Sequence, residues 1–196
     1  MTSSLQSAVG STMKPGILAL QGCIEPHVAM FKRLGIDCLK VRFPKELEAI
    51  DRIILPGGES TTMLILLEKQ GLVEPLLDFG KSNPVWGICA GAILIAKKVT
   101  HPEQRSLGLM NISANRNFYG SQRESFSTEI DISSPAIHAK VDFIRAPLLA
   151  PLSEEVEVVS KRDEQTIFLR EKRMWATAFH IELGEDTRLH EAFLKA

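Results

Sequence analysis

Val85-Trp86-Gly87-Ile88-Cys89-Ala90-Gly91 is the stretch that decides the fold. Residues 85–88 form a short apolar run, which predicts a buried strand, and residues 90–97 are rich in Ala, Ile and Leu, which predicts a helix. Between them, Cys89 occupies the nucleophile position of a G-x-nucleophile-x-G elbow, where small glycines permit a sharp turn. The start of the helix would favour the thiolate. Residues 87–91 alone fit a structural cysteine in a glycine turn equally well.

Strands and helices are expected to alternate along the rest of the chain. The other expected strands are 16–20, 38–41, 52–55 and 175–179, and the other expected helices are 25–34, 59–67, 72–79 and 186–194. Residues 156–159 and 166–169 are expected to form an antiparallel pair, whereas 108–144 look less regular. Such alternation predicts βαβ units. We therefore expect one three-layer α/β domain with a Rossmann-like, mixed, mainly parallel sheet.

The composition is that of a single globular domain. The chain has 196 residues, of which 44% are hydrophobic and 24% charged, enough for one sizeable core. A net charge of −1 gives no basic surface for nucleic acid, and no apolar run approaches the length of a membrane-spanning helix. Residues 1–13 show no targeting signal and are expected to be a flexible N-terminal extension, with Met13 a candidate start and residues 14–196 the domain.

His180 and Glu182 supply partners for the thiol of the elbow. They follow an expected strand, where residues i and i+2 point the same way, so both side chains can reach one site. Glu182 would orient His180 and stabilise its charged form, and His180 would serve Cys89 as base and acid. A lone histidine at a strand end is more often structural, and the fold must bring it to Cys89.

Residues 55–60, Leu-Pro-Gly-Gly-Glu-Ser, follow another expected strand. Gly57 and Gly58 let backbone N–H groups approach a ligand closely, where they can hold an oxyanion. Glu59 or Ser60 suits the start of the next helix as a cap. By itself, the pattern also fits an ordinary strand-to-helix turn.

Together these segments resemble the glutaminase subunits of pyridoxal 5′-phosphate synthases, a branch of the class I (triad) glutamine amidotransferases. The matching segments run in order over about residues 16 to 190: 18–22 (LALQG), 55–63 (LPGGESTTM), 89–91 (CAG), 115–122 (NRN followed by YGxQ), 143–147 (FIRAP) and 179–183 (FHxEL). The LPGGESTTM and FIRAP segments single out this branch, because Cys…His-x-Glu alone fits any triad amidotransferase.

The resemblance implies a class I amidotransferase fold and hydrolysis of L-glutamine to L-glutamate and ammonia through a glutamyl thioester. Cys89 would be the nucleophile, His180 the base and acid, and Glu182 the residue that orients His180. The N–H groups of Gly58 and Ala90 would form the oxyanion hole, with Gln21 near it.

Further family positions are those that contact glutamine: Gly58, Glu59, Ser60, Arg116, Ile144 and Arg145. A guanidinium such as that of Arg116 or Arg145 suits the α-carboxylate, and an acid such as Glu59 suits the α-ammonium. Without the motif, both arginines would be assigned to surface ion pairs. The resemblance also implies that the ammonia goes to a separate synthase subunit, within a large hetero-oligomer and without a cofactor.

Two departures from the family pattern leave alternatives open. Ile181 replaces the usual proline between His180 and Glu182, and Ser121 replaces an expected basic residue. The alternatives are a γ-glutamyl hydrolase, a glutaminase that serves another synthase, and a non-catalytic regulatory protein that retains the elbow.

The remaining cysteines and histidines receive no chemical role. Cys23 and Cys38 form no CxxC pair and are expected to be core thiols of a reduced, cytoplasmic protein. His27 is expected at the surface. His101, His138 and His190 have no metal-ligand spacing, so we predict no metal site.

Overall fold

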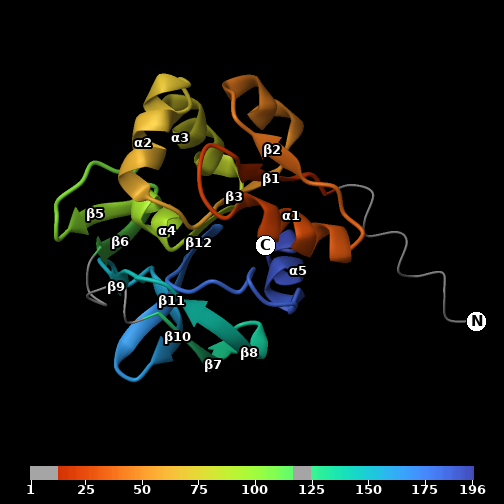
Figure 1. Cartoon of the computed structure of the whole chain (residues 1–196). Coiled ribbons are helices and arrows are strands. Elements are labelled where there is room, and N and C mark those ends of the chain that lie inside the picture. The colour runs from red at the N-terminus through yellow and green to blue at the C-terminus, as the bar shows by residue number, and fades with distance from the viewer. Residues whose placement is uncertain (1–12, 117–124) are drawn as a thin grey trace, which may run out of the picture.

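A mixed sheet of ten strands forms the centre of the part of the chain described by this computed structural model, residues 13–116 and 125–196 (Figure 1). Residues 1–12 of the expected extension, and Ser121 with the Tyr119–Gln122 motif, lie outside that part. The helices are α1 (Ile24–Arg33), the 3-10 helix η1 (Pro44–Ala49), α2 (Ser60–Lys69), α3 (Val73–Ser82), α4 (Ala90–Ile95) and α5 (Arg188–Leu194).

The strands lie in two sheets. Those of the large sheet, in spatial order, are β2 (Leu39–Val41), β1 (Pro15–Leu18), β3 (Arg52–Leu55), β4 (Val85–Ile88), β12 (Met174–Thr177), β11 (Gln165–Glu171), β9 (Leu148–Pro151), β6 (Met110–Asn115) and β5 (Ala96–Thr100), with β10 (Glu157–Arg162) paired to β11. A separate hairpin joins β7 (Phe126–Ser133) and β8 (Ala136–Phe143). The first five strands of the order are parallel, and the antiparallel pairings begin at β12.

Helices cover both faces of the parallel half. From β1 the chain steps to β2 on one side, whereas from β3 it steps to β4 on the other. Right-handed crossovers therefore put α1 on one face and α2 with α3 on the opposite face. Figure 1 shows α5 beside α1 and away from α2 and α3. The expected three-layer α/β fold with a mixed sheet is confirmed.

The strand register brings the expected site segments to one edge of the sheet. Leu55 of β3 pairs with Gly87 of β4, and Ile88 pairs with Thr177 of β12. Because parallel strands end at the same edge, the residues that follow β3, β4 and β12 meet there. The strands themselves are buried and mostly apolar, as expected for a sheet covered on both faces.

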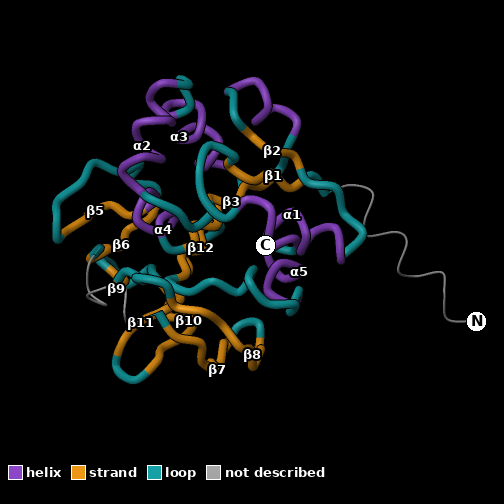
Figure 2. Tube along the Cα trace, viewed as in Figure 1, coloured by secondary structure: helices purple, strands orange, loops and turns teal. Residues whose placement is uncertain are grey.

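Several expected elements differ in extent (Figure 2). The helix expected over 90–97 ends at Ile95, because Ala96–Thr100 pairs with β6 as strand β5. The region 108–144 is more regular than expected, since it contains β6, β7 and β8. The strand expected over 175–179 ends at Thr177, so His180 lies beyond it in an isolated β-bridge with Asp142, and Glu182 lies in the turn that follows. Within the described residues, no helix has both the length and the apolar character that crossing a membrane requires.

Candidate active site

Cys89 lies on a tight turn between β4 and α4. Its φ of 49° is in the left-handed region, and its N–H donates to Thr177 O at 2.8 Å. A methyl group on Gly91 would come within 1.9 Å of Leu55 O, and one on Gly87 within 2.6 Å of the Gly91 backbone. The two glycines are thus needed for the chain to turn so close to β3. Cys89 is only 7% exposed, and its thiol donates to Ile144 O at 3.8 Å.

His180 and Glu182 meet beside this thiol. His180 Nδ1 and Glu182 Oε1 are 2.6 Å apart, and both side chains are buried. The Cys89 thiol lies near the His180 ring and is among the groups that raise the pKa of this imidazole. The backbone of His180 exchanges two hydrogen bonds with Asp142, at 2.7 and 3.0 Å, which fixes the residue even though it lies beyond the strand. Ile181, at the usual proline position, is buried, and the imidazole–carboxylate contact is short without the proline.

The Gly57-Gly58 turn lies against the His180 ring. A methyl group on Gly57 would meet His180 Cε1 at 2.2 Å. Gln21 lies on the other side of the turn, where its Oε1 accepts from Glu59 N at 2.8 Å. Ala90 is the first residue of α4, so its N–H has no acceptor within the helix. The three expected oxyanion-hole residues therefore lie on segments that converge on Cys89 and His180.

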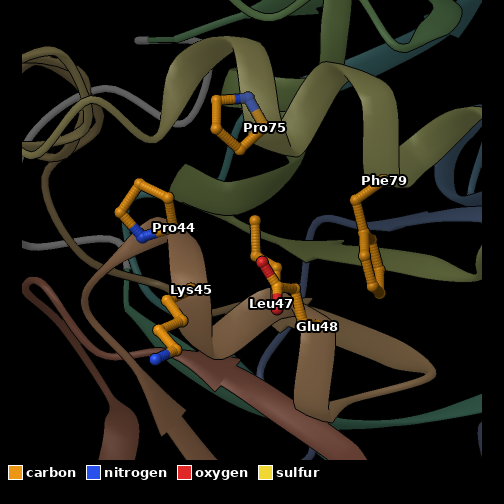
Figure 3. A pocket seen from close by; sticks show the side chains of 6 residues that line it. All are labelled: Pro44, Lys45, Leu47, Glu48, Pro75 and Phe79. Atoms are coloured by element: carbon orange, nitrogen blue, oxygen red, sulfur yellow. The ribbon is translucent and has the colours of Figure 1, made fainter.

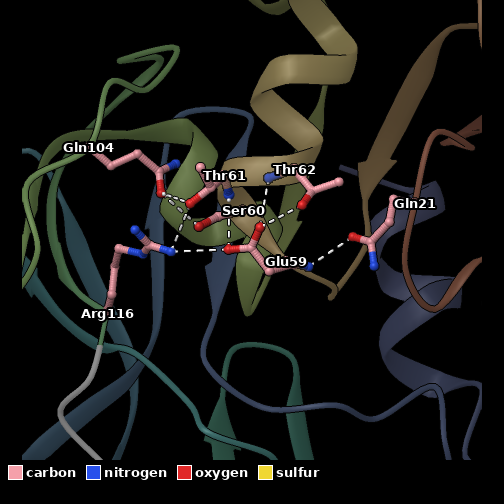
Figure 4. A network of polar contacts seen from close by, with 7 residues as sticks. All are labelled: Gln21, Glu59, Ser60, Thr61, Thr62, Gln104 and Arg116. Carbon is pink, nitrogen blue, oxygen red and sulfur yellow. Dashed lines mark hydrogen bonds and ion pairs between the residues drawn. The ribbon is translucent and has the colours of Figure 1, made fainter.

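The expected glutamine contacts at the start of α2 form a polar network (Figure 4). Glu59 caps the helix by accepting from Thr61 N and Thr62 N, and Arg116 Nη2 lies 3.1 Å from Glu59 Oε1. Although partial burial would raise the pKa of Glu59, the hydrogen bonds from the two threonines lower it. Ser60 donates to Gln104 Oε1 at 2.9 Å.

Ile144 and Arg145 reach the site differently. The Ile144 carbonyl accepts from the Cys89 thiol, while Arg145 is exposed and has a φ of 45°. The two residues follow β8, in which Asp142 holds the His180 backbone. The structure thus places the expected FIRAP segment beside the thiol and the imidazole.

Burial and hydrogen bonding act in opposite directions on the site's ionisable groups. Burial would lower the pKa of His180, but its hydrogen bonds with two thiols and with Glu182 raise it above the ordinary value. Burial would raise the pKa of Glu182, but interactions with His27 and His180 lower it. The geometry therefore favours a charged imidazole next to an ionised carboxylate.

Three contacts of the site have no counterpart in the sequence expectations. Cys23, expected as a core thiol, is half-buried, and its Sγ lies within 4.8 Å of a ring nitrogen of His180. Gln104 holds Ser60 from a loop that offers no pattern. His27 is not at the surface, as expected, but fully buried, and its Nε2 lies 3.7 Å from Glu182 Oε1. A signal for its burial was present, because His27, Met30 and Phe31 share one face of α1.

The donor atoms of Cys23, His180 and Glu182 lie within 4.8 Å of one another, a set of types that suits a transition metal. Two of the three donors are already joined by the short Nδ1–Oε1 hydrogen bond. A separate hollow of about 640 Å³ lies between η1 and α3 and shares no lining residue with the site (Figure 3). Its walls are Pro44, Lys45, Leu47, Glu48, Pro75 and Phe79.

Solved structures share this fold. One described as a glutamine amidotransferase superimposes with a TM-score of 0.87 at 38% identity, covering 92% of this chain and 97% of the other. A putative GMP synthase protein from Thermoplasma acidophilum has a TM-score of 0.68 at 16% identity, covering 93% of this chain and 92% of the other. The second likeness concerns the fold alone.

The strand order and the elbow together define the glutamine amidotransferase class of α/β proteins. The chain belongs to the SNO glutamine amidotransferase family, which it matches over residues 17–196. Similar proteins are the pyridoxal 5′-phosphate synthase subunits PdxT of Brevibacillus brevis (41% identity, covering 93% of this chain and 96% of that protein) and Roseiflexus castenholzii (44% identity, 93% and 100%).

Proposed function

We propose that this chain hydrolyses L-glutamine to L-glutamate and ammonia and passes the ammonia to the synthase subunit of a pyridoxal 5′-phosphate synthase, for vitamin B6 biosynthesis. The observation that carries the proposal is the placement of the His180 ring, which lies beside the Cys89 thiol and is hydrogen-bonded through Nδ1 to Glu182 at 2.6 Å. A nucleophile, a base and a group that orients the base are the three parts that thiol-dependent acyl transfer requires. The similarity to PdxT subunits supports the choice of partner.

In the first half-reaction, His180 takes the Cys89 proton and the thiolate attacks the side-chain carboxamide carbon of glutamine. Glu182 keeps the Nδ1–H of the imidazolium in place, so the Nε2–H faces the reacting atoms. The tetrahedral intermediate collapses when His180 donates its proton to the amide nitrogen. Ammonia leaves, and the γ-glutamyl group remains on Cys89 as a thioester.

In the second half-reaction, His180 removes a proton from water, which attacks the thioester carbonyl. Collapse of this intermediate expels the Cys89 thiolate and releases glutamate. Both intermediates carry an oxyanion, and we assign its stabilisation to the N–H groups of Gly58 and Ala90, with Gln21 holding the turn. Donors fixed before the reaction stabilise such charge without reorganisation.

Substrate orientation is assigned to the start of α2 and its neighbours. Arg116 suits the α-carboxylate of glutamine through two parallel N–H donors, and Glu59 suits the α-ammonium. Ser60, Ile144 and Arg145 complete the expected contacts. The existing Arg116–Glu59 ion pair supports this assignment, because it holds one cationic and one anionic group side by side.

The remaining proposals concern organisation. Residues 14–196 form one domain, in keeping with a core that runs from Ile17 to Leu194. The domain works in a large hetero-oligomer with synthase subunits in the cytoplasm. The three unbridged cysteines are in keeping with a reducing compartment. No metal, cofactor or nucleic acid takes part.

The test is ammonia release from glutamine by the wild-type complex with its synthase partner, compared with complexes that carry Cys89→Ala or His180→Ala. Both variants should release no ammonia above background. Acid quenching of the wild-type reaction should yield a glutamyl adduct on the peptide with Cys89. Release by Cys89→Ala would reject the mechanism, and equal rates with and without the synthase partner would count against partner activation. If the wild-type complex produced neither ammonia nor the adduct, the result would favour the non-catalytic regulatory protein.

A further inference from the structure

Two buried histidines lie behind the carboxylate of the site. His27 on α1 and His190 on α5 are 0% exposed, and their Nδ1 and Nε2 atoms are 2.8 Å apart. On its other side, His27 Nε2 lies 3.7 Å from Glu182 Oε1. We propose that His27 and His190 are positioning residues that keep Glu182 ionised and aligned with His180. The inference rests on the proposed glutaminase function.

Their surroundings keep both imidazoles neutral at neutral pH. His190 packs against Trp86 and Phe31, with ring centroids 5.1 and 5.4 Å away. Burial lowers the pKa of His27 to about 4 and also lowers that of His190. A neutral imidazole has one N–H donor and one acceptor nitrogen, so each ring must adopt one of two tautomers.

The carboxylate selects the tautomer of His27. An ionised Glu182 only accepts, so His27 is favoured with its proton on Nε2, facing Oε1. Its Nδ1 is then an acceptor, and His190 must donate from Nε2. The opposite arrangement would place a nitrogen lone pair against the negative carboxylate. His190 therefore fixes the proton of His27 on the side that faces the active site.

This arrangement favours the ionised carboxylate without adding a competing charge. At 3.7 Å the His27 N–H acts on Glu182 as a nearby dipole, since the distance exceeds that of a direct hydrogen bond. His27 Nε2 has no hydrogen-bond partner among the described residues, so its N–H is available to the carboxylate it faces. A charged His27 would instead compete with His180 for Glu182. The other titratable groups facing Glu182 are His180 and Cys23.

The discriminating variants are His27→Gln and His27→Asn, studied in the complete complex with the synthase partner. A glutamine amide nitrogen can take the place of Nε2 and face Glu182, whereas an asparagine amide reaches only the place of Nδ1 and bonds His190. We expect His27→Gln to retain kcat within about threefold, and His27→Asn to lower kcat about tenfold with little change in KM. The acid limb of the kcat/KM profile should move to higher pH in His27→Asn only.

His138→Gln is the matched control, because His138 is exposed and lies on β8. Equal kcat and equal acid limbs in the two His27 variants would overturn the proposal, even if both lowered the melting temperature. His190→Gln gives a second measurement if His27→Asn does not fold, and its acid limb should move the same way; an unmoved limb would also overturn the proposal. Cys89→Ala separates the two hypotheses, because an active Cys89→Ala complex would reject the glutaminase mechanism itself.

Discussion

Gly57 lies so close to the His180 ring that a methyl group on its Cα would come within 2.2 Å of His180 Cε1. The imidazole cannot move aside without losing a contact, because its Nδ1 is held by Glu182 and its backbone by Asp142. The turn at Gly57 therefore confines the His180 ring on one side.

Gly57→Ala should consequently damage catalysis more than stability. The added methyl group must tilt the ring away from Glu182 or from Cys89, and a displacement of about 1 Å costs roughly 100-fold in rate. We expect kcat for ammonia release to fall by about that factor. Gly184→Ala is the control, since its nearest neighbour would be Ile181 O at 3.5 Å. Wild-type kcat in Gly57→Ala would show that the ring is not confined as described.

Cys89 and Cys38 should react very differently with a glutamine-like electrophile. Burial raises the pKa of Cys38 to about 11, so it is almost entirely a thiol at neutral pH. Cys89 is the thiol that lies beside the His180 imidazole, which the proposed mechanism makes its base. Peptide mapping after brief exposure should find the label on Cys89, with protection by glutamine. Cys38→Ser is the control and should leave the labelling rate unchanged. A label found mainly on Cys23 would show that Cys89 is not the nucleophile.

The sequence predicted the parallel half of the fold and the antiparallel pair of β10 with β11 well, but it missed the strands between residues 96 and 151. Residues 52–55 and 85–88 are observed as strands with the expected bounds, because a short apolar run that leads into a glycine turn has few other folds. The expected helix 90–97 included the start of Ala96–Thr100. This segment is instead strand β5, which forms by pairing with β6. Such pairings depend on distant segments, which local pattern does not encode.

The site shows the same division between local and distant information. Cys89, His180 and Glu182 stand in recognisable motifs, and the structure places them together. Gln104 comes from an irregular loop, so no periodicity could mark it. His27 does lie on the apolar face of α1, yet its contact with His190 arises only when α1 and α5 pack side by side.

The two buried histidines should make the protein less stable in mild acid. Their folded-state pKa values lie below the ordinary 6.5, so the unfolded chain binds protons first as the pH falls, and folding loses free energy below pH 6.5. With the pKa of His27 at about 4 when folded, about 2 kcal/mol should be lost between pH 6.5 and about pH 5. The pKa of His180 is raised in the folded state and adds no slope there, because below its unfolded pKa both states are protonated.

Chemical denaturation at neutral pH and at about pH 5 measures this loss. A double variant, His27→Gln with His190→Gln, removes both titrating groups and should lose correspondingly less stability between the two pH values. His138→Gln should retain the wild-type difference, because His138 is exposed and lies outside the buried pair. An identical pH dependence in the double variant and the wild type would mean that the pair is protonated equally in both states.

Arg116 and Glu59 provide the last prediction, which concerns binding and not chemistry. Arg116 Nη2 contacts both Glu59 Oε1 and Thr61 Oγ1 at 3.1 Å, so its guanidinium is held at the start of α2. If it grips the α-carboxylate of glutamine, Arg116→Ala should raise KM about 10- to 100-fold and leave kcat within about threefold, because the contact is equal in ground and transition states. Arg116→Lys should recover only part of the loss, since a lysine cannot donate in two parallel directions.

Arg105→Ala is the control, as Arg105 pairs with Glu68 on the surface. An unchanged KM in Arg116→Ala would mean that the Arg116–Glu59 pair only stabilises the start of α2. A fall in kcat alone would mean that Arg116 supports the reacting groups and does not bind the substrate.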